Sequence, residues 1–512
     1  MFFLFPFAGF ALWYIYSTFN YRSRRNGATE IPGPKGLPIV GNVLDMPKDS
    51  QLIPVFNKWY REYGDLVSFK ILGINQVVLN TEKAANDLFV QRGNSYSDRG
   101  APTAIADDTW RQHRKLLHTV LSTPATVRYE PFIELETIYT LHDLLISPEK
   151  FSDHLERYAY GIVFRVGLGR RVQDLNDYVV QESIMGVDET LKAFRPDLFA
   201  CNIWPPLLHA PDWLVPSNKT LRRYLARLEG SIDLVQSDLK ARIKNRSAPE
   251  SLQKWFLEHM HEFDLTEEHG AWVFQSLVGA GTRSPYNAMM QYTINMMEHP
   301  EWQRKVQEEV DRVVGKDRLP SFEDLPNLPT VRAVIKEGIR YRSIVAEIGI
   351  PHKLDRDDFY EGYFIPKGTI LHANYSAILS DRELYPDGPV YNPARWLDPS
   401  YPTYKEPLTS YPSLQGFTSF GYGRRACPAA NFTERTLTVM VARLAWAFNI
   451  RKKVDPTTKM EIPLDIKYEP TPNPKPLPFP AVFEVRDQER ARVIKVEEAR
   501  ESARDPLRTK KD

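Results

Sequence analysis

The sequence predicts one large, mainly α-helical domain with a small β region, preceded by a single N-terminal transmembrane helix. Three features predict this class: long segments with helical periodicity and caps, a few short apolar runs with strand character, and an apolar N-terminus. Hydrophobic residues make up 42% of the 512 residues, enough for a large core, which excludes a disordered chain. The net charge of +1 creates no general attraction for nucleic acid, so we expect no nucleic-acid partner.

Residues 1–21 form the predicted membrane anchor. No charged residue precedes Arg22, and residues 2–19 would reach about 27 Å as a helix, close to the thickness of a bilayer core. Arg22, Arg24 and Arg25 follow the apolar run, whereas a secretory signal peptide carries its positive charge before it. By the positive-inside rule, this order keeps the rest of the chain in the cytosol. A buried core helix is the alternative for this segment.

The remaining chain divides by composition into three parts. Residues 22–48 combine the basic stop with a spacer rich in Pro and Gly, in which residues 31–42 cannot be helical because each proline fixes its φ angle. Residues 49–485 form the predicted catalytic domain. Residues 486–512 are a tail in which more than half of the side chains are charged, which predicts a solvated or frayed helix.

The longest predicted helix follows Thr266, which can cap its N-terminus, and continues to about Glu298. Further helices are expected over three segments: Glu301–Val314, about Thr330 to Arg342, and about Pro428 to Phe448. The strand-like runs are Leu66–Leu72, Gln76–Leu79, and a strand over 362–369 that turns at Pro-Lys-Gly and returns as Ile370–Asn374.

The most informative segment for chemistry is 420–429, which contains Cys427, one of two cysteines. Pro428 is expected at the first position of the following helix, so Cys427 would lie just outside a helix N-terminus, where backbone N–H groups favour a thiolate. A thiolate is a strong ligand for haem iron, and Arg425 is placed to pair with an acidic group of a cofactor. Taken alone, the segment favours a buried structural cysteine, and its Gly-x-Gly-x-x-Ala spacing lacks the preceding strand of a dinucleotide site. Cys201 is expected to be a small core residue.

This segment resembles the Phe-x-x-Gly-x-Arg-x-Cys-x-Gly haem-binding signature of the cytochrome P450 family, with Ala429 in place of the final Gly. Further matches follow in family order over about residues 30–450: Trp110-x-x-x-Arg114, Glu337-x-x-Arg340 and Pro393–Trp396. The Pro-Gly-Pro spacer behind an N-terminal anchor is similar to that of the microsomal members. Each motif is weak by itself, whereas the ordered set is specific.

The resemblance implies the cytochrome P450 fold, haem b as the cofactor and Cys427 as the axial ligand of the haem iron. The other cofactor-binding residues that it implies are Phe420 and, around the haem propionates, Trp110, Arg114, His352 and Arg425. It also implies electrons from NADPH through a separate NADPH–cytochrome P450 reductase, because this chain contains no flavin or nicotinamide domain. The microsomal likeness implies the endoplasmic reticulum membrane, with the catalytic domain on the cytosolic side.

The function that the resemblance implies is that of a membrane-anchored monooxygenase. Its substrates would be dioxygen and a bulky, mostly hydrophobic organic molecule, because the segments that line the family's substrate pocket have mixed apolar character here. The overall likeness is to fungal members that tailor secondary metabolites, which makes a tailoring step the expected reaction.

The sequence departs from the family on the longest predicted helix, where the family pattern is Ala/Gly-Gly-x-Asp/Glu-Thr-Thr/Ser. Arg283 replaces the acid and Ser284 the threonine, the pair that the family uses to deliver protons to dioxygen. An arginine stays protonated at any working pH and cannot exchange a proton as a carboxylate does, whereas Ser284 keeps a hydroxyl. Pro285 removes the N–H that would bond to the Gly281 carbonyl, which predicts a local kink.

Two interpretations of Arg283 are open at this point. In one, Arg283 points away from the iron toward solvent or a buried acid, and water relays the protons. In the other, proton delivery is weakened, and Arg283 and Ser284 serve a non-oxygenating reaction such as oxidative coupling, dehydrogenation or rearrangement. A haem-binding protein without turnover is a further alternative.

Overall fold

The computed structural model describes seven stretches of the chain, and all statements below concern them: residues 23–47, 52–99, 108–193, 198–202, 205–342, 349–469 and 473–508. The chain forms two compact units, and each is treated by itself. The first comprises residues 1–106, 348–378 and 422–425, and the second comprises residues 107–347, 379–421 and 426–512. The prediction of a mainly helical class with a small β region is confirmed.

The predicted transmembrane helix at residues 1–21 lies outside the described residues. Within the part of the chain that the structure describes, no helix combines the length and the apolar character needed to span a membrane.

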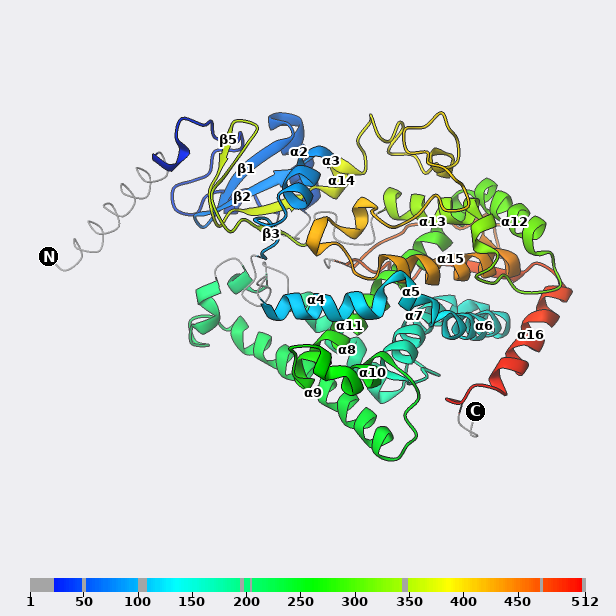
Figure 1. The fold of residues 1–512 in the computed structure, drawn as a ribbon. Helices are drawn as coiled ribbons and strands as arrows, with labels where there is room; N and C mark the ends of the chain where they lie inside the picture. The colour runs from blue at the N-terminus through cyan, green and yellow to red at the C-terminus, as the bar shows by residue number, and fades with distance from the viewer. Residues whose placement is uncertain are drawn as a thin grey trace. The chain divides into compact units, whose positions relative to one another are not determined.

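The first unit is built on a four-stranded sheet in the order β1-β2-β6-β3 (Figure 1). Its strands are β1 (Leu66–Ile71), β2 (Ile74–Leu79), β6 (Ile370–Ala373) and β3 (His352–Lys353). The β1–β2 hairpin turns at Leu72 and Gly73, which both have positive φ angles, and β2 then pairs in parallel with β6. Helix α2 (Leu52–Tyr63) buries Phe56 and Trp59, whose rings contact Phe69 of β1.

The predicted hairpin after residue 362 is wrong in its pairing. The strand is present as β5 (Tyr363–Ile365), but its partner is β4 (Asp358–Tyr360). The returning strand is β6, which pairs with β2 and β3 instead. The Pro-Lys-Gly turn therefore passes the chain from one sheet to another rather than closing a hairpin.

The Pro- and Gly-rich spacer lies along β1. Ser68 of β1 donates its N–H to the Pro32 carbonyl at 2.8 Å and its hydroxyl to the Ile31 carbonyl at 2.7 Å. A Cβ at Gly33 would lie 1.8 Å from the Ser68 carbonyl oxygen, so only glycine permits this approach. The spacer is thus non-helical, as expected, and is also part of the packed body.

The second unit is organised around α11 (Glu267–Glu298), which packs against α7 (Phe151–Leu168) (Figure 1). Thr266 caps α11 by accepting the His269 N–H, as predicted, and the helix continues through Pro285. The other elements that matter below are α4 (Asp108–Leu121), α5 (Thr123–Val127), α6 (Glu130–Ile146), α8 (Tyr178–Ala193), α9 (Ser217–Lys244), α10 (Leu252–His259), α12 (Pro300–Val314), α13 (Pro329–Tyr341), α15 (Ala430–Ala447), β7 (Phe448–Lys452) and β8 (Ala481–Val485).

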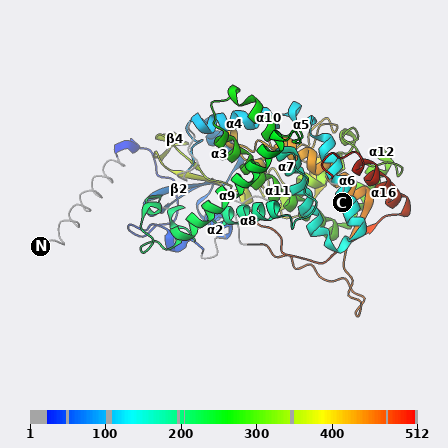
Figure 2. The same ribbon diagram turned by 90° about the horizontal axis from the view of Figure 1, so that it is seen from below.

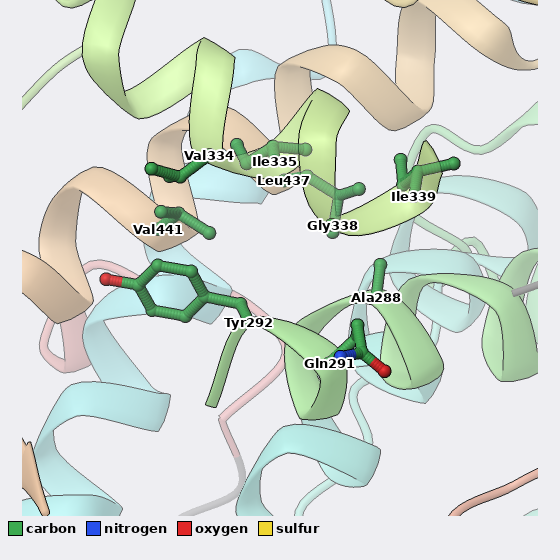
Figure 3. Close-up of a pocket in the computed structure, with 9 residues that line it drawn as sticks. All are labelled: Ala288, Gln291, Tyr292, Val334, Ile335, Gly338, Ile339, Leu437 and Val441. Atoms are coloured by element: carbon green, nitrogen blue, oxygen red, sulfur yellow. The ribbon is translucent and has the colours of Figure 1, made fainter. Parts of the chain in front are cut away.

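Side chains of α11, α13 and α15 interlock in the core of the second unit. Figure 3 shows Tyr292 and Ala288 of α11 facing Val334 and Gly338 of α13 and Val441 of α15. The cavity between them measures about 10 Å³, which is room for about one water molecule. The cavity between these three helices is therefore too small for a ligand larger than a water molecule.

A buried network of ion pairs and hydrogen bonds connects α13 to residues 392–396. Glu337 is fully buried and accepts hydrogen bonds from Arg340 at 2.8 and 2.9 Å and from Arg395 at 3.1 Å. The Trp396 Nε1–H and the Asn392 N–H complete its coordination at 3.0 and 2.9 Å. The Glu-x-x-Arg pair and the Arg of the 393–396 segment, two of the family motifs, thus meet in one buried network.

The C-terminal segment forms a helix, as predicted, but this helix is packed on one face rather than fully solvated or frayed. Helix α16 (Gln488–Ser502) is capped by Asp487, buries Val493 and Ile494, and lies beside α6 (Figure 2). Asp505 beyond it is buried and pairs with Arg165 of α7 at 2.9 Å. Counting charged residues missed this because the apolar contacts of α16 occupy a narrow face and its charges pair with one another.

Candidate active site

Cys427 lies in a tight connection before α15. Its N–H donates to the Phe420 carbonyl at 2.6 Å, and the chain enters this connection through Gly421, whose φ angle is 84°. Helix α15 begins at Ala430, two residues later than predicted, so Pro428 belongs to the preceding turn. The Ala429 N–H still hydrogen-bonds to the sulfur.

The sulfur of Cys427 is accessible although protein atoms surround it on most sides. This desolvation raises the pKa of the Cys427 thiol, while the Ala429 N–H and the charge of Arg114 act in the opposite direction. The surroundings alone therefore favour the thiol, contrary to the expectation from the helix N-terminus. A bound metal ion deprotonates a coordinating thiol outright, so this balance does not oppose ligation.

Trp110 and Arg114 lie one turn apart on α4, and the helical spacing places them on one face. Both side chains are half-buried. Burial lowers the pKa of the Arg114 guanidinium because desolvation disfavours the cation, and the charge of Cys427 partly offsets this. Arg114 and Cys427 are thus electrostatic neighbours within the second unit.

In the first unit, Arg425 and His352 both bond to the backbone of one short segment. Arg425 Nε donates to the Ser97 carbonyl at 2.7 Å, and His352 Nδ1 bonds to the Tyr96 carbonyl at 2.6 Å. The His352 ring also stacks on Phe89 with 3.9 Å between ring centroids. Two of the four residues predicted around the haem propionates, Arg425 and His352, are therefore held by the same backbone segment.

Arg99 joins this group and was missed by sequence reasoning. It donates to the Pro351 carbonyl at 2.9 Å, next to His352. Burial and the neighbouring charge of Arg425 lower the pKa of Arg99 to about 10. Burial and the charge of Arg99 lower the pKa of His352 to about 3. Arg99 and Arg425 form a cationic cluster, which favours an anionic ligand, and the neutral ring of His352 lies beside Arg99.

Gly423 is required where the signature segment passes this group. Its φ angle is 54°, and a Cβ there would lie 2.2 Å from the Phe89 carbonyl oxygen. Any other residue would push the segment away from Phe89 and, with it, from the ring of His352.

Arg283 on α11 is buried and engaged with two acids. Its Nη1 donates to Asp188 of α8 at 2.7 Å, and its Nη2 pairs with Glu469. Its Nε donates to the Asn473 carbonyl at 2.9 Å, and the Asn473 amide in turn donates to the Ser284 hydroxyl at 3.1 Å. Of the two interpretations left open by the sequence, the pairing of Arg283 with an acid is the one observed.

A model of the family Cytochrome P450 matches residues 31–473. The chain belongs to the cytochrome P450 family. It is 43% identical to the cytochrome P450 monooxygenase psoD of Aspergillus fumigatus, over 91% of this chain and 93% of that protein. It is 29% identical to the cytochrome P450 monooxygenase verL of Clonostachys rogersoniana over 99% and 97% of the two chains, and 30% identical to virE of Hypocrea virens over 85% and 81%.

Membership makes this cytochrome P450 an oxidoreductase of the monooxygenase type with a haem iron cofactor. The residues present fit that group. Cys427 combines a soft ligand atom, an accessible sulfur and the neighbouring cation Arg114. Cys201 lacks these properties because it is buried against Phe199 and Leu221, as the sequence predicted. The cationic cluster of the first unit suits the carboxylates that haem carries.

The residues of this cytochrome P450 that sequence reasoning missed share one property. Arg99, Asp188, Glu469 and Asn473 belong to none of the motifs, and their partners are far away in the sequence. For Asp188 and Glu469 the unusual Arg283 was a partial signal, since an arginine that becomes buried is often paired with an acid. For Arg99 and Asn473 the sequence carries no comparable signal.

Proposed function

We propose that Cys427 would hold the iron of haem b, and that this monooxygenase transfers one oxygen atom of dioxygen to a bulky, mostly hydrophobic substrate while the other leaves as water, with two electrons from NADPH and two protons. The observation that carries the proposal is the accessible Cys427 sulfur, held by the Phe420 carbonyl and flanked by Arg114. The fungal relatives support a tailoring step in secondary-metabolite biosynthesis as the reaction.

The chain's own residues bind and orient the cofactor in this proposal. The haem iron, when bound, supplies the activation of dioxygen. In the second unit, Trp110 and Arg114 donate to a propionate, and Phe420 shapes the segment around Cys427. In the first unit, Arg425, Arg99 and His352 serve the same function for a carboxylate. Desolvation of the arginines strengthens their attraction for an anion, and the neutral His352 can offer only a hydrogen bond.

Ser284 is the residue that handles a proton in this proposal. Its hydroxyl accepts from Asn473, which leaves its own hydrogen available as a donor. Arg283 holds its neighbours in place and does not exchange a proton, because its guanidinium is permanently charged. The substitution that motivated non-oxygenating chemistry is thus accounted for by the pairing of Arg283 with Asp188 and Glu469.

Electrons come from NADPH through a separate NADPH–cytochrome P450 reductase in this proposal, and residues 1–21 anchor the enzyme in the endoplasmic reticulum membrane with its catalytic domain in the cytosol. Alkaline carbonate washing of microsomes tests the anchor. Full-length enzyme is expected to stay with the membranes, and a variant without residues 1–21 is expected to be released. Release of both proteins would remove the anchor from the proposal.

The absorption spectrum of the reduced, carbon monoxide-bound enzyme tests the ligand. The wild type is expected to have the Soret band of thiolate-ligated haem, and Cys427→Ser is expected to lose it. Cys201→Ser is the matched control, since it removes the other thiol and should leave the band unchanged. A wild-type band of another type, or one that survives in Cys427→Ser, would contradict the proposal. Oxygen-isotope tracing into the product then tests oxygen insertion.

A further inference from the structure

Ser284 differs from the other serine and threonine side chains of α11. Ser276, Thr282 and Thr293 each donate to a carbonyl of their own helix, at 2.6, 2.8 and 3.0 Å. Such a bond uses up the hydroxyl proton. Ser284 instead accepts a bond from Asn473 at 3.1 Å, and the structure gives its proton no acceptor among the described residues. The direction of this single bond decides whether Ser284 can donate elsewhere.

A chain of three amide and carbonyl groups determines that direction. The Pro474 carbonyl can only accept, so Asn287, 3.0 Å away, must present its Nδ2. The same Nδ2 lies 2.7 Å from Asn473, which must therefore present its Oδ1. The opposite end of the Asn473 amide, its Nδ2, then faces Ser284. If the Asn287 amide were reversed, its oxygen would face the Pro474 carbonyl oxygen. If the Asn473 amide were reversed, its NH₂ group would face the NH₂ group of Asn287.

This orientation has a local cost. The Asn287 Oδ1 is buried and has no hydrogen-bond partner among the described residues. Burying an unsatisfied acceptor is unfavourable, so packing alone does not explain the arrangement. The bond from Asn287 to Asn473 is retained in spite of it.

Arg283 fixes the backbone of Asn473. Its Nε donates to the Asn473 carbonyl at 2.9 Å, while Asp188 and Glu469 hold the rest of the guanidinium. Asn473 is therefore bound to α11 through both its carbonyl and its side-chain amide. This gives Arg283 a function at a position where the family has an acid.

We infer that Asn473 is a positioning residue, which makes Ser284 an acceptor on the side of the 473–474 segment so that its proton is donated toward the dioxygen site. The inference rests on the proposed function, in which Ser284 handles the proton. Asn473 itself touches neither substrate nor cofactor in this account and acts through Ser284.

Asn473→Asp is the sharpest test because a carboxylate keeps the size of the side chain and the bond from Asn287 but can only accept. It would draw the Ser284 proton to itself. We expect the stretching frequency of carbon monoxide bound to the reduced enzyme to change as it does in Ser284→Ala, since both variants remove the donor. We also expect the ratio of hydrogen peroxide to product to rise about tenfold or more in both.

A double variant separates action through Ser284 from a general effect on structure. Ser284→Ala combined with Asn473→Asp is expected to equal Ser284→Ala alone in both readouts. Ser276→Ala is the matched control on the same helix, and we expect the wild-type frequency for it. Asn473→Ala, which removes the amide without adding charge, serves in place of Asn473→Asp if the latter does not fold, with the same expected changes.

The outcomes distinguish the inference from the proposed function. If Ser284→Ala changes the frequency and neither Asn473 variant does, or if the double variant exceeds Ser284→Ala, the inference is overturned while the proposed function stands. If the wild type lacks the thiolate-type Soret band, the proposed function fails first. If Ser284→Ala changes nothing, Ser284 does not donate, and the inference is overturned with its proposed proton role.

Discussion

The two units surround their functional-site arginines with opposite kinds of partners. In the second unit, Arg283 stands where the family motif has an acid, and two carboxylates, Asp188 and Glu469, neutralise it. In the first unit, Arg425 stands where the motif requires it, bonds to a backbone carbonyl and lies close enough to lower the pKa of Arg99. Two carboxylates neutralise the charge of Arg283, whereas Arg99 and Arg425 bring two like charges close to each other.

This difference shows why a departure from a motif need not be a departure in chemistry. Arg283 changes the sign of one charge, and the acids on α8 and in the 469–473 segment change the sign of its surroundings. The positive charge of Arg283 is therefore neutralised by Asp188 and Glu469. The hydroxyl that we propose to donate a proton is still present at Ser284. By contrast, Arg425 and Arg99 of the first unit donate to backbone carbonyls, and the charge of Arg425 acts on Arg99.

The largest expected effect comes from Arg283→Asp. The new carboxylate would face Asp188 and Glu469, and we expect a loss of about 3 kcal/mol in the free energy of unfolding, because the buried position would then hold a negative charge beside two others. Urea unfolding of the full-length enzyme measures this. Asp188→Arg in the same chain is the matching control, since it restores an opposite pair and should recover part of the loss. Unchanged stability with increased hydroxylation would instead mean that Arg283 restrains proton delivery.

The cationic cluster should affect haem retention rather than folding. We expect Arg99→Gln and Arg425→Gln each to increase the rate of haem loss to an acceptor protein about tenfold, which corresponds to about 1.4 kcal/mol, because each removes a desolvated partner of the anion. Arg92→Gln is the control in the same unit, since Arg92 is paired with Asp358 at 2.8 Å and is partly exposed. Equal rates in all three variants would show that the cluster does not hold the cofactor.

Local signals explain what the sequence predicted well. The bounds of α11 follow from Thr266 and the acidic first turn, and those of α12 follow from Pro300 and Gly315, because caps act within one turn. The pairing of β6 with β2 was missed because the two strands are almost 300 residues apart and nothing near β6 marks its partner. The Pro-Lys-Gly turn favoured a hairpin locally, and the tertiary pairing overrode it.

The same division applies to the candidate site. Cys427, Trp110 and Arg114 were found because fixed spacings place them on one loop and one helix face. The acids that neutralise Arg283 and the amide that directs Ser284 come from segments about 95 and 190 residues away, as the separations of the bonded residues show. No spacing rule connects such residues, so the orientation of Ser284 was open until the hydrogen bonds of Asn473 were known.

A smaller loss of stability is expected from Arg283→Lys, which separates the charge of Arg283 from its hydrogen-bond geometry. Lysine keeps the charge but lacks the planar fork that reaches Asp188, Glu469 and the Asn473 carbonyl together. We expect a loss of about 1 kcal/mol in the free energy of unfolding and a higher ratio of peroxide to product, because the Asn473 backbone is released. Arg227→Lys, at another arginine paired with acids in the second unit, is the control for the ratio. A wild-type ratio in Arg283→Lys would show that charge alone is sufficient.

The smallest expected effect is on the pH dependence of the free energy of unfolding, and it comes from His352. It also tests whether a carboxylate of the cofactor lies near this ring. Its Nδ1 carries a hydrogen to donate to the Tyr96 carbonyl, and burial together with the charge of Arg99 lowers its pKa to about 3, so the folded state keeps the ring neutral. An unfolded histidine takes up a proton near pH 6.5, so this histidine makes the folded state lose stability as the pH falls below that value. Between pH 7 and pH 6 we expect the wild type to lose about 0.7 kcal/mol more than His352→Gln in urea unfolding. Parallel profiles would mean that His352 titrates normally in the folded enzyme, which requires a carboxylate close to its Nε2. The same measurement therefore tells whether the ring only orients Phe89 or also meets the anion that the cluster attracts.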